Sequence, residues 1–245
     1  MKLKTSLFAL LLAGYSFAQI QFPQVSTKAE IEQTIGFTKI EVEYFRPNLN
    51  NRTAFGGIVP YGQVWRTGAN NNTTIEFETD VLIEGKSLAK GEYSLYTKPN
   101  EKSWEVYFYK TTDNWGNPKN WDESNIVLKV NVPSIKVADK VESFTIGFDD
   151  VNTGSGKLFI AWENTKVNVK IEAPTHQIVL DNIKNQLNDK SSGRDFYGAA
   201  NYYYTNNLDL KKSQEWINKA IAKEQKAPQH YLDLKAKIES DLKKK

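Results

Sequence analysis

Apolar and polar side chains alternate with a period of two over much of residues 36–173, and this pattern constrains the fold of the chain more than any other feature. Apolar Ile40, Val42 and Tyr44, for example, are separated by single charged residues. Successive side chains of a strand point to opposite faces of its sheet, so each run predicts a strand with one buried and one solvated face, as in antiparallel sheets. Similar runs occur at residues 75–81, 104–108, 126–132, 144–148, 158–162 and 167–171.

Turn-forming residues separate these runs. Glu84-Gly85, Lys90-Gly91 and the glycine-rich residues 152–156 are typical of tight connections between antiparallel strands. Roughly seven or eight short strands joined in this way predict a β-sandwich, jelly-roll-like and antiparallel, for residues 19–173. The chain has no cysteine, so its stability depends on burying its apolar residues, which make up 40% of the sequence.

After Pro174 the hydrophobic period changes to that of a helix. Leu180, Ile183 and Leu187, for example, share one helical face. Stripes of this kind predict a small all-α tail over residues 174–245, with four short helices whose neighbours pair as antiparallel hairpins. Small Ala199 and Ala200 with the larger side chains around them resemble one tetratricopeptide-type helical hairpin.

The first residues have the composition of an export signal. Lys2 and Lys4 precede a short apolar run at residues 7–13, and small residues follow it. This order predicts a signal peptide over residues 1–18, cleaved before Gln19, and a periplasmic or extracellular location. The apolar run is too short to cross a bilayer, so no membrane span is predicted.

The net charge argues against a nucleic-acid partner. The formal charge of the chain is +3 at pH 7, and removing the two lysines of the predicted signal peptide leaves +1. Proteins dedicated to nucleic acids are usually far more basic. We therefore expect no nucleic-acid binding.

Residues 46–72 form the most unusual part of the predicted body, because three arginines lie among turn-forming asparagines and glycines. The planar guanidinium group pairs bidentately with carboxylate or phosphate, which favours a ligand site for a glycan or an anionic small molecule. The alternative is that these groups bond backbone carbonyls and so order a long irregular loop. The asparagines likewise either contact a ligand or close turns. The candidate ligand-binding residues of this segment are Arg46, Arg52, Trp65, Arg66, Thr67, Asn70 and Asn71.

A second polar loop, at residues 113–122, contains Trp115 and Trp121. An exposed indole has an apolar face and a polar edge, which suits stacking on a sugar ring. Both tryptophans are therefore candidate ligand-binding residues beside the arginine segment. Acidic residues in this loop do not match the spacing of a calcium loop, and no metal site is predicted.

Several strings of residues resemble a known family. Arg46-Pro47, the sequence WRTGAN at residues 65–70 and GEYSLY at residues 91–96 are similar to motifs of a widespread family of exported bacterial proteins, domain of unknown function 2911. The resemblance covers residues 23–173. It implies an export signal and a β-rich body, and it supplies neither an activity nor a catalytic residue.

Enzyme chemistry has little support in the sequence. The chain has two histidines, both in the predicted helical tail, and it lacks a nucleophile elbow, a phosphate loop and a dinucleotide fingerprint. No catalytic residue and no cofactor are predicted, and the leading hypothesis is an exported, non-catalytic binding protein.

One alternative is a polysaccharide hydrolase with paired carboxylates. Its candidates are Glu41, Glu43, Glu76, Glu78, Asp149 and Asp150. A second alternative is a structural or assembly protein that docks a protein partner through its helical tail.

Overall fold

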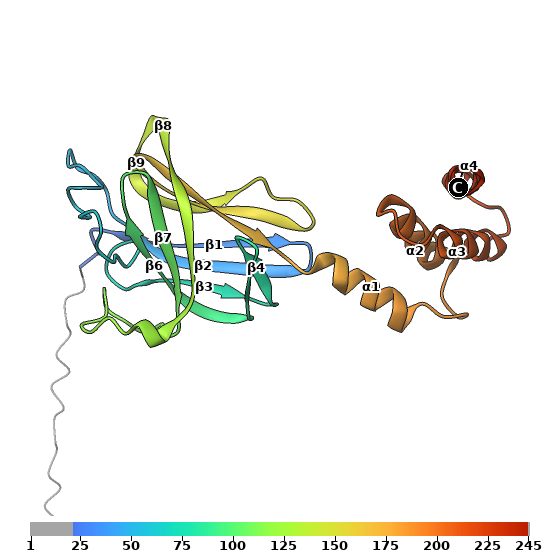
Figure 1. Ribbon diagram of the computed structural model, residues 1–245, viewed down its shortest axis with the longest axis horizontal. Coiled ribbons are helices and arrows are strands. Elements are labelled where there is room, and N and C mark those ends of the chain that lie inside the picture. Colours follow the sequence, from blue (N-terminus) through green and yellow to red (C-terminus); the bar gives the residue numbers. More distant parts are fainter. Residues whose placement is uncertain (1–21, 245) are drawn as a thin grey trace, which may run out of the picture.

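The computed structural model describes residues 22–244, so the predicted signal peptide lies outside the described residues. A β-rich body comes first and four helices follow it (Figure 1). The strands are β1 (Thr27–Ile35), β2 (Thr38–Arg46), β3 (Thr73–Phe77), β4 (Val81–Ile83), β5 (Lys86–Leu88), β6 (Gly91–Pro99), β7 (Ser103–Tyr109), β8 (Ile126–Asp149) and β9 (Ser155–Glu172), with a 3-10 turn, η1 (Glu123–Asn125), before β8. The helices are α1 (Thr175–Gln186), α2 (Gly193–Thr205), α3 (Leu210–Ala222) and α4 (Gln229–Lys243).

Within the described residues the nine strands form one antiparallel sheet in the order β1-β2-β3-β6-β7-β8-β9-β4-β5, and the sheet is not closed. The prediction of an antiparallel β-rich body followed by a helical tail is therefore confirmed. A sandwich or jelly roll in particular is not confirmed, because the strands belong to one continuous hydrogen-bonded sheet.

The two longest strands fold this sheet over. The first part of β8 pairs with β7 as far as Pro133, whereas the part from Ser134 onward pairs with β9. Proline has no amide hydrogen and so interrupts the hydrogen bonds between two strands, which accounts for the change of partner at Pro133. The pairing of β8 with β9 also shifts register twice, between Lys136 and Val141 and between Val141 and Thr145. Such irregularities bend and twist a strand.

Some strand boundaries differ from the predicted ones. Residues 75–81 were expected to form one strand, but β3 ends at Phe77 and β4 begins at Val81, in a different part of the sheet. Conversely, the predicted runs 126–132 and 144–148 are parts of one strand, β8. Alternation reports which side chains are buried, but it does not say where the backbone turns or continues.

One large apolar core lies between the folded parts of the sheet. It contains the alternating residues expected from the sequence, such as Ile40 and Val42 of β2, together with Phe144 and Ile146 of β8. The Tyr44 ring meets the Phe144 ring edge-on at 5.8 Å, and its hydroxyl donates to the carbonyl of Ile146 at 3.1 Å. Side chains from β2 and β8, which are not neighbours in the sheet, therefore share one interior.

The helices have a separate core. Residues such as Phe196 of α2, Ile217 of α3 and Ile238 of α4 are buried together, and neither α3 nor α4 contributes to the core of the sheet. The Ser192 hydroxyl accepts from the Asp195 amide in a capping box that begins α2. The α2–α3 pair packs as an antiparallel hairpin, but its specific likeness to a tetratricopeptide unit is not confirmed.

Figure 1 shows α1 leading from the body toward the α2–α4 bundle. No α1 residue is fully buried. The main polar link to the bundle is between His176 Nδ1 and the Tyr202 hydroxyl, which lie 2.8 Å apart. Among the described helices, none is long and apolar enough to cross a membrane.

Because the two cores are separate, we expect the β-rich body to fold without the helices. A chain that ends at Ala173 keeps the backbone bond from its amide to the Gly154 carbonyl, at 2.9 Å. Its free energy of unfolding should lie within about 0.5 kcal/mol of that of the body in the full chain. Urea unfolding followed by tryptophan fluorescence measures this, and a non-cooperative transition would contradict it.

Candidate functional site

The segment between β2 and β3 is held in place by aromatic side chains that enter the core. The Trp65 ring stacks on Trp162 with centroids 5.9 Å apart, and Phe55 meets Trp104 at 4.6 Å. Trp65 also exchanges two backbone hydrogen bonds with Thr97 of β6, of 2.7 and 2.9 Å. A segment without a strand of its own is thus fixed at the end of the body opposite α1 (Figure 1).

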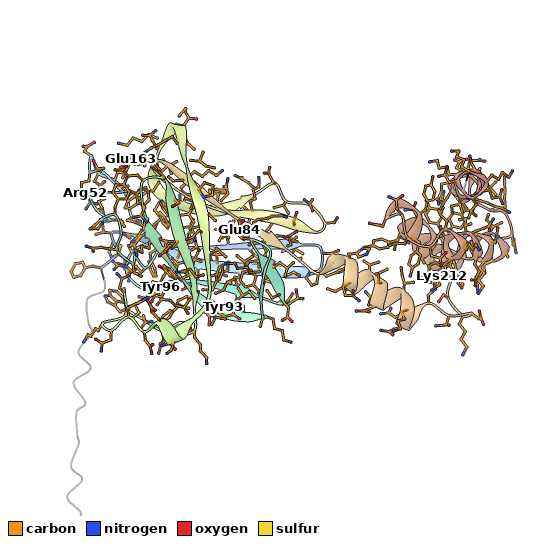
Figure 2. The ribbon with its side chains drawn as sticks, viewed as in Figure 1. Arg52, Glu84, Tyr93, Tyr96, Glu163 and Lys212 are labelled. Atoms are coloured by element: carbon orange, nitrogen blue, oxygen red, sulfur yellow. The ribbon has the colours of Figure 1, made fainter. Side chains whose placement is uncertain are left out.

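Two of the three arginines in this segment serve the fold. Arg46 donates through Nε to the carbonyl of Phe144 at 3.0 Å and through Nη2 to the Thr145 hydroxyl at 2.9 Å. Arg52, labelled in Figure 2, donates to the carbonyl of Leu49 at 2.9 Å and to that of Asn48 at 3.0 Å. For Arg46 and Arg52 the structure therefore shows the loop-ordering role that was the alternative to ligand binding.

Arg66 is different. It is partly buried, and no side chain or backbone group among the described residues accepts a hydrogen bond or forms an ion pair with its guanidinium group. Its Nε atom is fully buried without a partner. Burial lowers the pKa of Arg66 from its ordinary value, while the nearby Tyr96 acts in the opposite direction. An arginine stays charged at neutral pH even so, which leaves a cation with spare donors.

Arg66 lines a cavity of about 370 Å³. This lies within the range of roughly 300–1,000 Å³ that is usual for small-molecule sites. Apolar walls come from residues such as Val59, Trp65 and Trp162, and polar groups come from Arg52, Gln63 and Asn117. Two of the described lining residues are arginines and none is acidic. The cavity is therefore electropositive and suits an anionic group.

The backbone beside Arg66 is strained. Thr67 has a φ of 58°, a conformation that β-branched residues rarely adopt. Its buried hydroxyl donates to the Thr97 hydroxyl at 3.1 Å, and its carbonyl accepts from the Thr73 hydroxyl at 2.6 Å. Thr67 thus fixes the direction of the chain at Arg66 and does not offer its own hydroxyl to a ligand. Strain of this kind is concentrated at functional sites.

The predicted asparagines lie at the margin of the site. The side-chain amide of Asn70 donates to Gln24 Oε1 at 2.9 Å and to the Ser26 carbonyl at 3.2 Å, so it holds the start of the described chain against the segment between β2 and β3. Asn71 is exposed. Neither residue lines the cavity at Arg66.

The two candidate tryptophans of the 113–122 loop have different surroundings. Trp121 stacks on Tyr109 with centroids 4.8 Å apart and covers a cluster of buried tyrosines that includes Tyr96, labelled in Figure 2. Trp115 is 72% exposed and lines a second cavity of about 490 Å³. Trp121 therefore packs against the body, and Trp115 is free for a ligand.

Asn117, which is not among the predicted ligand-binding residues, also contributes to the site. Its Nδ2 donates to the Val64 carbonyl at 2.7 Å, which fastens the 113–122 loop to the arginine segment. It lines both cavities. The amide-rich composition of the loop was the signal that could have indicated it.

The acidic residues of the hydrolase alternative lie elsewhere. Asp149 and Asp150 pair with Lys166 and Lys157, and Glu41 pairs with Lys39 at 3.1 Å. None of the six candidates lines either cavity. In the described part of the chain no group of three or more histidine or acidic side chains is arranged to hold a metal ion.

A family model described as "Protein of unknown function (DUF2911)" matches residues 26–171. The match spans the whole β-rich body, from β1 to β9, and excludes the helical tail. No curated protein and no solved structure matches the chain.

The different environments of Arg46 and Arg66 predict opposite effects on stability. Arg46→Ala should lower the free energy of unfolding by about 1–3 kcal/mol, because it removes donors from partly buried acceptors. Arg66→Met should leave that free energy unchanged or raise it, because it replaces an unpaired, partly desolvated cation with an apolar side chain of similar length. Urea unfolding of both variants checks this, and a large loss of stability for Arg66→Met would show that its guanidinium group supports the fold.

Proposed function

This chain belongs to the DUF2911 family, for which no activity is assigned, and we propose from its own geometry that it is a non-catalytic binding protein for a small ligand with a carboxylate or similar planar anion. The unpaired guanidinium group of Arg66 in an electropositive cavity is the observation that carries the proposal. A bidentate carboxylate would satisfy this group and restore the interactions that it loses on leaving water.

The proposed setting is outside the cytoplasm, in the periplasm or beyond the cell. It rests on the signal-like composition of residues 1–18. We further interpret the body as sandwich-like, since side chains from both folded parts of the sheet share one core. The small, buried Ala199 and Ala200 of α2, of which Ala200 belongs to the helical core, favour a tetratricopeptide-like hairpin.

Titration calorimetry with D-glucuronate, acetate and neutral methyl β-D-glucoside tests the proposal. We expect saturable binding of the two anions and none of the glucoside. Arg66→Ala should raise the Kd for glucuronate at least tenfold, since a charge-assisted hydrogen bond contributes about 1.5–3 kcal/mol. Arg66→Lys should give an intermediate Kd, because an ammonium group keeps the charge and loses the planar fork.

The matched control is Arg194→Ala, which removes the same type of side chain from an exposed position on α2. Its Kd for glucuronate should equal that of the wild type. Equal binding by wild type and Arg66→Ala, or no binding of either anion, would rule out the proposed function.

The assembly alternative is favoured by one observation. A cavity of about 680 Å³ separates α1 from α2 and α3, and apolar residues such as Leu180, Ile183 and Trp216 line it. We propose as the second candidate function that the helical tail docks a protein partner through this surface, and a second copy of the chain is the partner that is tested. The hydrolase alternative has no comparable support, because no carboxylate lines the cavity at Arg66.

Sedimentation velocity tests this second candidate function. The full chain should form a dimer as its concentration rises, and Leu180→Lys should keep it monomeric because a charge replaces an apolar contact. Asn185→Lys, which adds the same charge at an exposed α1 position outside the cavity, is the matched control and should still dimerise. A full chain that stays monomeric at every concentration would exclude a second copy as the partner.

A further inference from the structure

We propose that the cavity at Arg66 is one half of a two-part site, and that its natural ligand is an oligosaccharide in which an acidic sugar is linked to a neutral one. The acidic sugar occupies the Arg66 cavity and the neutral sugar stacks on Trp115. This inference rests on the proposed function and specifies its ligand class.

The two cavities adjoin each other. Asn117 lines both of them, so one side chain forms the boundary between the Arg66 cavity and the Trp115 cavity. Gly116 brings the backbone of the tryptophan loop against the arginine, because a Cβ atom built there would lie 3.2 Å from Arg66 Nη1. Gly116 also has a φ of 82°, which suits glycine, and this permits the close approach.

The Trp115 cavity has the composition of a neutral sugar site. Trp115 supplies a largely exposed aromatic face. Its other described lining residues include amides with donors and acceptors, Asn114, Asn120 and Asn125, and one residue of each charge, Asp113 and Lys119. An indole face stacks on the apolar face of a pyranose ring, while amides bond its hydroxyls. The opposite charges give this half no preference for an anion.

The charges of the two halves therefore set the order of the sugars. The Arg66 half contains two arginines and no acid, so a uronic acid carboxylate is favoured there. In the other half Asp113 offsets the attraction of Lys119 for a second carboxylate, so a carboxylate gains nothing there. A chain made only of uronic acids fits this arrangement less well than an acidic sugar beside a neutral one.

The tryptophan loop is held in position before any ligand arrives. The backbone N–H of Asn72 donates to the backbone carbonyl of Asn114 at 3.1 Å, and the side-chain Nδ2 of Asn117 donates to the carbonyl of Val64 at 2.7 Å. Trp121, at the other end of the loop, stacks on Tyr109. A site that is already ordered loses less entropy on binding, which favours recognition of a weakly binding ligand such as a sugar.

Calorimetry with two probes tests the inference: D-glucuronate and an aldobiouronic acid, the disaccharide of glucuronic acid linked to xylose. The wild type should bind the aldobiouronic acid about tenfold more tightly than glucuronate, as expected for one added stacked ring with its hydrogen bonds. Trp115→Ala should reduce that ratio to about one and leave the Kd for glucuronate unchanged. Arg66→Ala should weaken the binding of both acidic probes.

Phe37→Ala is the matched control, because Phe37 is also an exposed aromatic residue, 53% exposed, on the turn between β1 and β2. It should keep the tenfold ratio. Equal affinity of the wild type for glucuronate and the disaccharide would overturn the two-part site while leaving the proposed function intact. An unchanged ratio in Trp115→Ala would also overturn it. Failure of every acidic probe to bind would instead refute the proposed function.

Discussion

The insertion of Trp65 and Phe55 into the core of the body is the interaction on which the candidate site depends. These rings join Trp104, Phe144 and Trp162 in one set of aromatic contacts, with Trp65 and Phe144 centroids 5.1 Å apart. Aromatic side chains bury large areas and prefer defined ring geometries, so they hold a loop in one place. Without them the residues between β2 and β3 would have neither strand nor helix to position them.

This anchoring explains why Arg66 differs from its neighbours. Trp65 points into the core, and the next residue along an extended chain points the other way. Arg66 is thereby directed toward the cavity and the tryptophan loop, where the fold supplies no acceptor. A partly desolvated guanidinium group whose buried Nε has no partner lowers the stability of the folded state. Natural proteins retain such features mainly where function requires them.

The parts of the fold that could be predicted are those that local sequence encodes. Alternation around Ile40 and Val42 identified buried strand faces, and the helical stripe through Leu180 and Leu187 identified the tail. The long β8 and the break between β3 and β4 were not predicted. The alternation lapses between Pro133 and Ser143 although β8 continues through these residues, so periodicity alone cannot show that the two runs belong to one strand.

By itself the sequence determined that a cysteine-free β-rich body precedes a helical tail, and that arginines and tryptophans gather in two loops. Only the tertiary structure decided which of them are available to a ligand. Arg46 is occupied by the carbonyl of Phe144, 98 residues away in the chain, and Trp121 is covered by its contact with Tyr109. Whether a donor is free depends on acceptors that the fold brings from distant strands, and no local pattern of residues contains that information.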